Sequence, residues 1–163
     1  MATFTFVHVV ISLVAIVSGF VVLFGFLTNR EWEYGTELFL STTILTSVTG
    51  YGFPATHVTP GHVVGAISLV VLAVAIYAKY VRHAQGAWRS AYLVNSVVAL
   101  YLNFFVLIVQ LFQKVPTLKA LAPTQSEPPF AVTQLAALIV FVVLGTAAVY
   151  RFQTSPTVRT IEA

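Results

Sequence analysis

The sequence contains no cysteine and no aspartate among its 163 residues, and only 8% of its residues are charged. The absence of cysteine excludes disulfides, thiolate metal sites, cysteine-ligated iron–sulfur clusters and covalently attached c-type haem. A soluble domain carries about a quarter charged residues, so this chain has too few to cover a water-facing surface. With 58% hydrophobic residues and a mean hydropathy of +0.92, the composition predicts an integral membrane protein in a lipid bilayer.

Acidic groups are scarce as well as unevenly placed. None of the five glutamates lies in the middle of an apolar run, which argues against a proton pump built on buried carboxylates. The net charge of +3 does not indicate a nucleic-acid partner, because the basic residues stand at the ends of apolar runs, where membrane topology places them.

Five runs approach the roughly 20 apolar residues that a helix needs to cross a bilayer. They cover residues 4–27, 37–54, 61–80, 90–112 and 131–150. The second run is short and rich in Ser and Thr, which is tolerated in a membrane when the hydroxyls bond to helix carbonyls. The sequence therefore predicts one all-α domain over residues 1–163, a bundle of five transmembrane helices, or of four if 37–54 does not span.

The basic residues indicate the orientation of this bundle. Five spans place six basic residues on one side, against Lys114 and Lys119 on the other: Arg30, Lys79, Arg82, Arg89, Arg151 and Arg159. With four spans the split is only five against three, so the positive-inside rule favours five. It predicts an N-terminus outside the cell membrane and a short cytoplasmic tail over residues 151–163.

Three of the four histidines then fall on the outer side. His57 and His62 lie in "FPATHVTPGHVVG", the turn between the second and third spans, and His8 lies near the start of the first. Thr59 and Pro60 have the residue types of a helix N-cap and first helical position. A small-residue stripe, which is where membrane helices pack, predicts that His8 faces protein; it consists of His8, Ser12, Ala15 and Gly19.

A polar pocket is predicted at the same outer end. The fourth span carries a polar stripe of Asn95, Asn103, Gln110 and Gln113, and Gln134 begins the fifth span. The proline-rich connection between these spans is stiff and contains Glu127. We expect this connection to fold over the pocket as a lid.

Several functions fit this pocket, and the sequence leaves them open. His8 and His62 are suited to bind haem b between facing helices, and His8, His57 and His62 are suited to bind one transition-metal ion, in a redox or electron-transfer role. Without a metal, histidine and glutamine can hold a quinone or a transported small molecule. The candidate cofactor-binding residues are His8, His62, Gln110, Gln134 and Glu127.

The alternative is a non-catalytic structural or assembly subunit with no cofactor, in a larger membrane complex or a homo-oligomer. Its histidines and amides then only connect helices, at about 0.6 kcal/mol each. No catalytic residue is predicted, and no spacing has the specificity of a haem or zinc motif.

The outer connection "FQKVPTLKALAPTQSEPPF" resembles a segment of small polytopic bacterial inner-membrane proteins. The "FPATHVTPGHVVG" turn is similar to the corresponding turn in them. The resemblance covers most of the chain and implies a bacterial inner membrane, with the outer face in the periplasm. It implies no activity, cofactor or catalytic residue, because none is established for that group.

Overall fold

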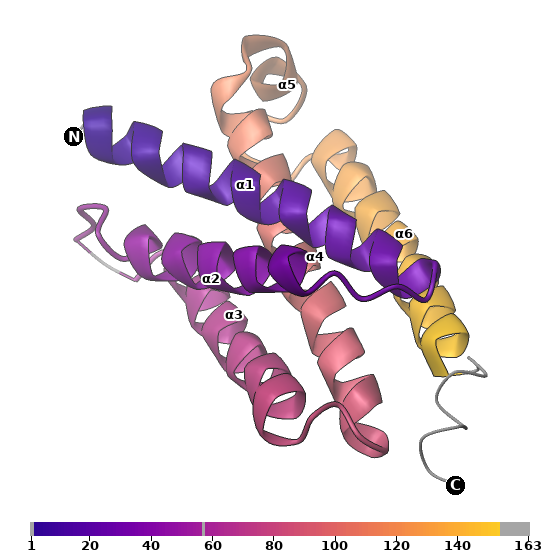
Figure 1. Cartoon of the computed structure of the whole chain (residues 1–163). Coiled ribbons are helices and arrows are strands. Elements are labelled where there is room, and N and C mark those ends of the chain that lie inside the picture. The colour runs from indigo at the N-terminus through magenta and orange to yellow at the C-terminus, as the bar shows by residue number, and fades with distance from the viewer. Residues whose placement is uncertain (1, 57, 154–163) are drawn as a thin grey trace, which may run out of the picture.

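The computed structural model describes residues 2–56 and 58–153, and this part of the chain is helical without strands (Figure 1). The elements follow one another as α1 (Ala2–Leu27), α2 (Glu33–Gly50), α3 (Pro60–Ile76), the π-helix η1 (Tyr77–Val81), α4 (Ala87–Lys114), α5 (Pro116–Leu121) and α6 (Pro128–Gln153).

Four helical segments are long and apolar enough to cross a membrane: α1, α3 with η1, α4 and α6. The protein is therefore a multi-pass α-helical membrane bundle of four or five spans. Helix α2 has 18 residues, roughly 27 Å at 1.5 Å per residue, and is the most polar of the long helices. Its hydroxyls bond to carbonyls one turn back, as Ser47 does to Thr43 at 2.9 Å, so they suit an apolar environment.

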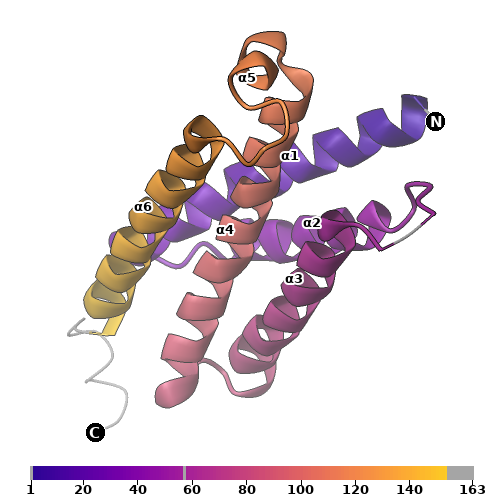
Figure 2. The ribbon, with the colours of Figure 1, turned by 180° about the vertical axis from the view of Figure 1, so that it is seen from behind.

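Helices α1 and α2 form an antiparallel pair that runs obliquely across α3, α4 and α6 (Figures 1 and 2). We call the end of the bundle with His8, the 51–59 turn and the 115–127 loop the histidine end. The opposite end, which we call the arginine end, carries the 28–32 and 82–86 loops. There Arg151 of α6 donates to the Leu27 carbonyl at 3.3 Å.

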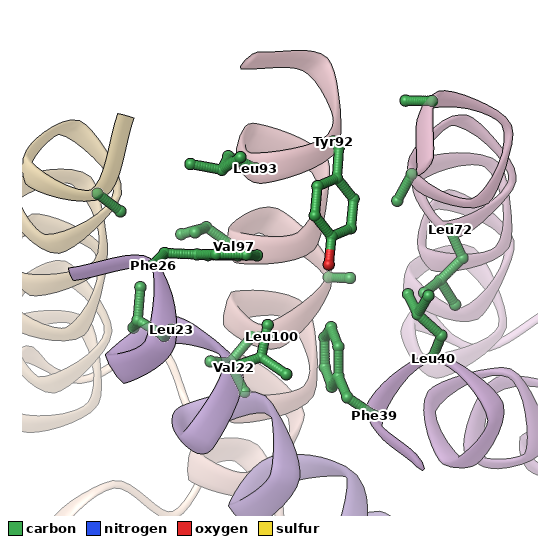
Figure 3. Close-up of a cluster of buried hydrophobic side chains, with 14 of the residues drawn as sticks. Val22, Leu23, Phe26, Phe39, Leu40, Leu72, Tyr92, Leu93, Val97 and Leu100 are labelled. Carbon is green, nitrogen blue, oxygen red and sulfur yellow. The ribbon is translucent and has the colours of Figure 1, made fainter. Parts of the chain in front are cut away.

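The core lies where α1, α2 and α4 meet (Figure 3). The predicted small-residue stripe of α1 faces this core, since Ala15 is 0% exposed and Gly19 is buried. A Cβ atom on Gly19 would lie 2.5 Å from Leu100 Cδ1 and 2.8 Å from Phe39 Cε2. Only glycine therefore allows α1 to approach α2 and α4 this closely.

The predicted fold class is confirmed, with differences at the element boundaries. Helix α2 begins four residues before the predicted 37–54 segment and ends at Gly50, where the chain turns toward Pro54. The connection after α4 contains α5, which packs through Leu118 and Ala122 against Phe112 and was not predicted. The last turns of the third span form the π-helix η1, also not predicted. Residues 154–163 of the predicted tail lie outside the described part.

Candidate functional site

His8 is half-buried on α1 and bonds across to α2. Its Nδ1 lies 2.8 Å from Thr49 Oγ1, and its ring packs edge-on against Phe53 at 5.0 Å between centroids. The Thr49 hydroxyl gives its hydrogen to the Leu45 carbonyl at 2.6 Å, so its oxygen accepts from His8. His8 therefore carries its proton on Nδ1 and has a lone pair on Nε2.

His62 has the opposite tautomer, because its ring completes the N-cap of α3. The Thr59 N–H donates to His62 Nδ1 at 3.2 Å, and Thr59 Oγ1 accepts from the His62 N–H at 3.4 Å. The ring also stacks on Tyr51, 5.2 Å away and 7° from parallel. Neutral His62 therefore carries its proton on Nε2.

These tautomers bear on metal binding. A ligating histidine donates one ring N–H to a second-shell acceptor and binds the metal through the other nitrogen. His8 has this arrangement. To ligate through Nε2, His62 must move its proton to Nδ1 and so lose the hydrogen bond that Nδ1 accepts from the Thr59 N–H. Among the described residues no three His, Cys, Asp or Glu side chains gather into a metal-binding group. His57 lies outside the described residues.

The other predicted site residues are dispersed over the histidine end. Gln110 is half-buried on α4, and Gln134 of α6 donates to the Phe105 carbonyl at 3.3 Å. Glu127 accepts hydrogen bonds from Thr124 within its own turn. In both views α5 stands at the ends of α4 and α6, apart from the 51–59 turn (Figures 1 and 2). The loop packs against α4 and α6 through Leu118 and Ala122.

Glu127 lies outside the spans, and its carboxylate organises the turn before α6. Desolvation acts to raise the pKa of Glu127, but hydrogen bonds from the N–H and hydroxyl of Thr124 and the N–H groups of Glu127 and Ser126 outweigh it. The pKa therefore lies below its ordinary value of 4.5.

This lowered pKa predicts an acid-labile turn. A carboxylate with a depressed pKa stabilises the turn above the ordinary value, and this stabilisation is lost as the pH falls through the lowered pKa. Protection of the Thr124 and Ser126 amides from hydrogen exchange, relative to an unstructured peptide at the same pH, should fall in that range. Glu127→Gln should show weak protection at neutral pH already. Equal protection of the native turn above and below this range would contradict the assignment.

Further buried polar groups lie between α2 and α4. Asn103 of α4, 9% exposed, donates to the hydroxyl of fully buried Thr43 at 3.2 Å. One turn nearer the histidine end, the Thr46 hydroxyl is buried with no hydrogen-bond partner among the described residues. A buried hydroxyl of this kind needs a partner, because an unsatisfied group costs about 1–3 kcal/mol.

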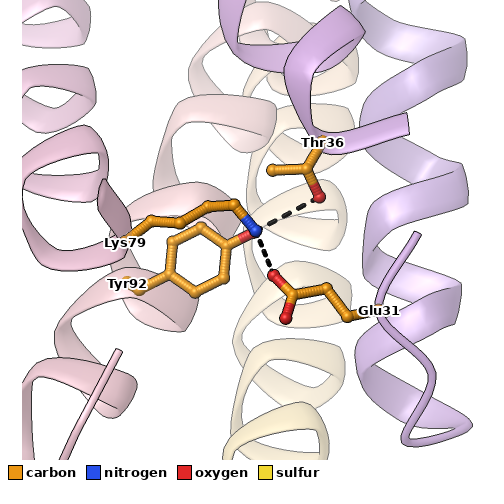
Figure 4. Close-up of polar contacts among 4 residues, drawn as sticks. All are labelled: Glu31, Thr36, Lys79 and Tyr92. Atoms are coloured by element: carbon orange, nitrogen blue, oxygen red, sulfur yellow. Dashed lines mark hydrogen bonds and ion pairs between the residues drawn. The ribbon is translucent and has the colours of Figure 1, made fainter. Parts of the chain in front are cut away.

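A second polar group lies at the arginine end (Figure 4). Lys79 of η1 forms an ion pair with Glu31 of the 28–32 loop, and its Nζ lies 5.2 Å from the ring centroid of Tyr92. Tyr92 is 0% exposed and donates to Thr36 Oγ1 at 3.4 Å. The Lys79 side chain is only 12% exposed, whereas that of Glu31 is 41% exposed, so the ion pair has one largely buried and one exposed partner.

Together these residues form three separate hydrogen-bonded pairs spaced along α2, His8 with Thr49, Asn103 with Thr43 and Tyr92 with Thr36, and the Thr46 hydroxyl lies between the first two. We call them the polar track: His8, Thr49, Thr46, Thr43, Asn103, Thr36 and Tyr92. Thr36 and Thr49 are 13 residues apart, which is about 20 Å along the helix. Phe39, 1% exposed, interrupts the track between Thr36 and Thr43. Phe39 therefore divides the polar track into a histidine-end part, from His8 to Asn103, and an arginine-end part, Thr36 and Tyr92.

The outward surfaces of the bundle are apolar by contrast. Leu38, Leu45 and Val48, on the other face of α2, are about half exposed. An open groove of about 420 Å³ between α4 and α6 is lined mainly by valine and aromatic side chains, with Gly145 among them. These apolar surfaces suit contact with lipid, in contrast to the polar track on the inner face of α2.

Sequence reasoning missed the part of the site at the arginine end. Glu31 and Lys79 are 48 residues apart, and in the sequence Lys79 entered only the count of basic residues. One available signal was a lysine inside the last turns of an apolar run, since ionisable residues within spans are functional candidates with a partner to be sought. Thr36 and Thr43 repeat at seven residues, which was a second signal.

Comparison of the chain with protein-family models, with curated proteins and with solved structures finds no match. The fold and site define its class, a multi-pass α-helical membrane protein in which a few hydrogen-bonded polar groups lie beside the apolar core between α1, α2 and α4.

Proposed function

We propose that the protein is a transport protein that moves a small polar species through the interior between α1, α2 and α4. The observation that carries this proposal is the polar track, which presents hydroxyl, amide and imidazole groups inside the bundle along most of α2. The unpartnered Thr46 hydroxyl supports it further, because it offers a hydrogen bond to water or to a passing solute.

Labelling of single cysteines tests whether the track admits water. The chain has no native cysteine, so each introduced thiol reports on one position only. Thr46→Cys and Leu45→Cys are adjacent, but Thr46 faces the track whereas Leu45 is 48% exposed on the apolar surface. A charged, water-soluble methanethiosulfonate reagent should modify the Thr46→Cys variant in liposomes and leave the Leu45→Cys variant unmodified, because thiolates form in water and not in lipid.

Equal protection of both thiols would overturn the proposal. The polar track would then consist of hydrogen bonds that hold helices together without water, and the non-catalytic assembly subunit would be the better account. The folded state of each variant is checked by its elution as a single species in detergent, so that loss of labelling is not confused with aggregation.

A second candidate function is supported by the tautomer of His8. Its Nδ1–H is held by Thr49 and its Nε2 has no hydrogen bond to the described residues, which is the arrangement of a haem or metal ligand. A Soret band, or a stoichiometric transition metal that His8→Ala removes, would favour this function. A purified protein without either would contradict this second function.

We also propose a bacterial inner-membrane location with the arginine end in the cytoplasm. The support is the gathering of Arg30, Arg82, Arg89 and Arg151 at one end of the bundle, as the positive-inside rule requires. A fluorescent reporter fused after Ala163 should be active, and alkaline phosphatase fused at the same position should be inactive. The reverse pattern would contradict the orientation.

A further inference from the structure

We infer that the groove between α4 and α6 binds an anionic phospholipid of the surrounding membrane, with one acyl chain in the groove and the phosphate at the guanidinium of Arg89. The inference is independent of the proposed transport function, because no residue of the polar track lines this groove. It joins two features of the structure, an apolar groove that opens toward lipid and a positive charge where that groove ends.

The groove is apolar and lies on the outer surface of the bundle. Helices α4 and α6, which supply its lining, lie side by side in both views (Figures 1 and 2). The most deeply buried lining residues are Val97 and Phe141, whereas Val142 at the rim is 58% exposed. Gly145 leaves room between the helices, since a Cβ atom there would already lie 3.1 Å from Val97 Cγ1. An apolar surface of this kind gains by contact with a hydrocarbon chain.

The length of the groove matches one leaflet of a bilayer. Its lining on α6 runs from Leu138 to Tyr150, which are 12 residues or about 18 Å apart along the helix axis. The hydrocarbon core of a bilayer is about 30 Å thick, so each leaflet contributes about 15 Å. Tyr150 lies in the last turn of α6, at the arginine end. An acyl chain in the groove therefore extends from the arginine-end surface to the middle of the membrane.

Arg89 of α4 places a positive charge where the groove ends. Its Cζ lies 4.6 Å from the centroid of the Phe152 ring, so the guanidinium reaches from α4 to the last turn of α6. Phe152 is only two residues beyond Tyr150 of the groove. The half-buried Arg89 guanidinium donates no hydrogen bond to the described residues. Its five N–H groups therefore need acceptors, and phosphate oxygens supply them in a bidentate geometry.

The surrounding charges favour an anionic lipid over a zwitterionic one. Arg151, also in the last turn of α6, adds a second positive charge. The described carboxylates of the arginine end belong to the 28–32 loop and to α2, where Glu31 is paired with Lys79. Basic sites between membrane helices bind anionic head groups. A phosphatidylcholine head group carries its own cation, which the two arginines repel.

Lipid retention, measured by native mass spectrometry, tests the charge at this site. The full chain in detergent is incubated with equal amounts of phosphatidylglycerol and phosphatidylcholine that have identical acyl chains. The native protein should retain about fivefold more phosphatidylglycerol, since one basic residue near an anionic surface contributes about that factor. Arg89→Gln should lower this ratio toward one. Arg82→Gln is the matched control, because the Arg82 guanidinium stacks on Trp88 at the same end, and it should leave the ratio close to native.

A pair of tryptophan variants tests the groove itself. Val142 and Val143 are neighbours on α6 and are 58% and 60% exposed, but only Val142 lines the groove. Val142→Trp should fill the groove and reduce the retained phosphatidylglycerol several-fold, whereas Val143→Trp should bind as the native protein does. Thr146→Trp fills the same groove from the next turn, in case Val142→Trp does not yield folded protein.

Three results would overturn the inference. Equal retention of the two lipids by the native protein would contradict an anionic site, and equal losses in Arg89→Gln and Arg82→Gln would contradict the role of Arg89. Equal retention by Val142→Trp and Val143→Trp would contradict an acyl chain in the groove. Excess inorganic phosphate should leave the lipid bound, because the acyl chain contributes to binding. Displacement by phosphate would show that the head group binds alone and would also contradict the role of the groove.

Discussion

Gly19→Val should destabilise the bundle by about 1–3 kcal/mol, the range for forcing extra carbon atoms into a packed core. The added Cβ alone would meet Leu100 Cδ1 at 2.5 Å and Phe39 Cε2 at 2.8 Å, and neither side chain has space to move into because both are buried. Helix α1 must therefore move away from α2 and α4. Unfolding of the purified protein by increasing mole fractions of sodium dodecyl sulfate measures the change.

Gly65→Ala is the matched control for this prediction. A Cβ on Gly65 would lie 3.4 Å from the Tyr51 ring, which is ordinary contact, and Gly65 lies in the interior of α3. Alanine in a helix is favoured over glycine by roughly 0.5–1 kcal/mol, so this variant should be unchanged or more stable. If Gly19→Val is as stable as the native protein, α1 does not pack against Phe39 and Leu100 as described.

Lys79→Met should destabilise the arginine end by about 1–3 kcal/mol. Exposed ion pairs contribute about 0.2–1 kcal/mol, whereas breaking a buried pair costs about 3–5 kcal/mol. The Lys79–Glu31 pair lies between these limits, because the Lys79 side chain is 12% exposed and that of Glu31 is 41% exposed. Methionine keeps the length of the side chain, so the measured loss reports on the charge.

A double-mutant cycle separates the ion pair from the other contacts of Lys79. In a Glu31→Gln background, Lys79→Met should cost clearly less than in the native protein. Lys119→Met on exposed α5 is the control for loss of one positive charge and should have little effect. Equal costs of Lys79→Met with and without Glu31 would show that the pair contributes nothing to stability.

The spans could be predicted from the sequence because apolar length is a local property. Hydropathy gave α1, α3 with η1, α4 and α6 within a few residues, and the residue types at Thr59 and Pro60 gave the start of α3. The predicted bounds of α2 were shifted by four residues because its Ser and Thr residues weaken the apolar signal. Its packing between α1 and α3 depends on tertiary contacts, which hydropathy does not report.

The site was harder to predict because its contacts join distant parts of the chain. The stripe that places His8 toward protein has a local period and is confirmed at Ala15 and Gly19. The partner of His8 is Thr49, 41 residues away, and no local pattern names it. The sequence analysis placed His62 in a ligand site. Residue type and spacing do not show which group each ring nitrogen of His62 contacts, so the hydrogen bond to Thr59 could not be predicted. Its role in the cap follows only from the position of Nδ1 beside the Thr59 N–H.

A cysteine scan of α2 from position 36 to position 49 tests the central claim most directly. In liposomes, the water-soluble reagent should modify positions 43 and 46, which face the histidine-end part of the polar track, and spare positions 38, 45 and 48, which face lipid. Position 39 should be protected, because Phe39 is buried in the apolar core. A scan in which all these positions are equally protected, or in which the lipid-facing positions react fastest, would contradict a hydrated polar interior along α2.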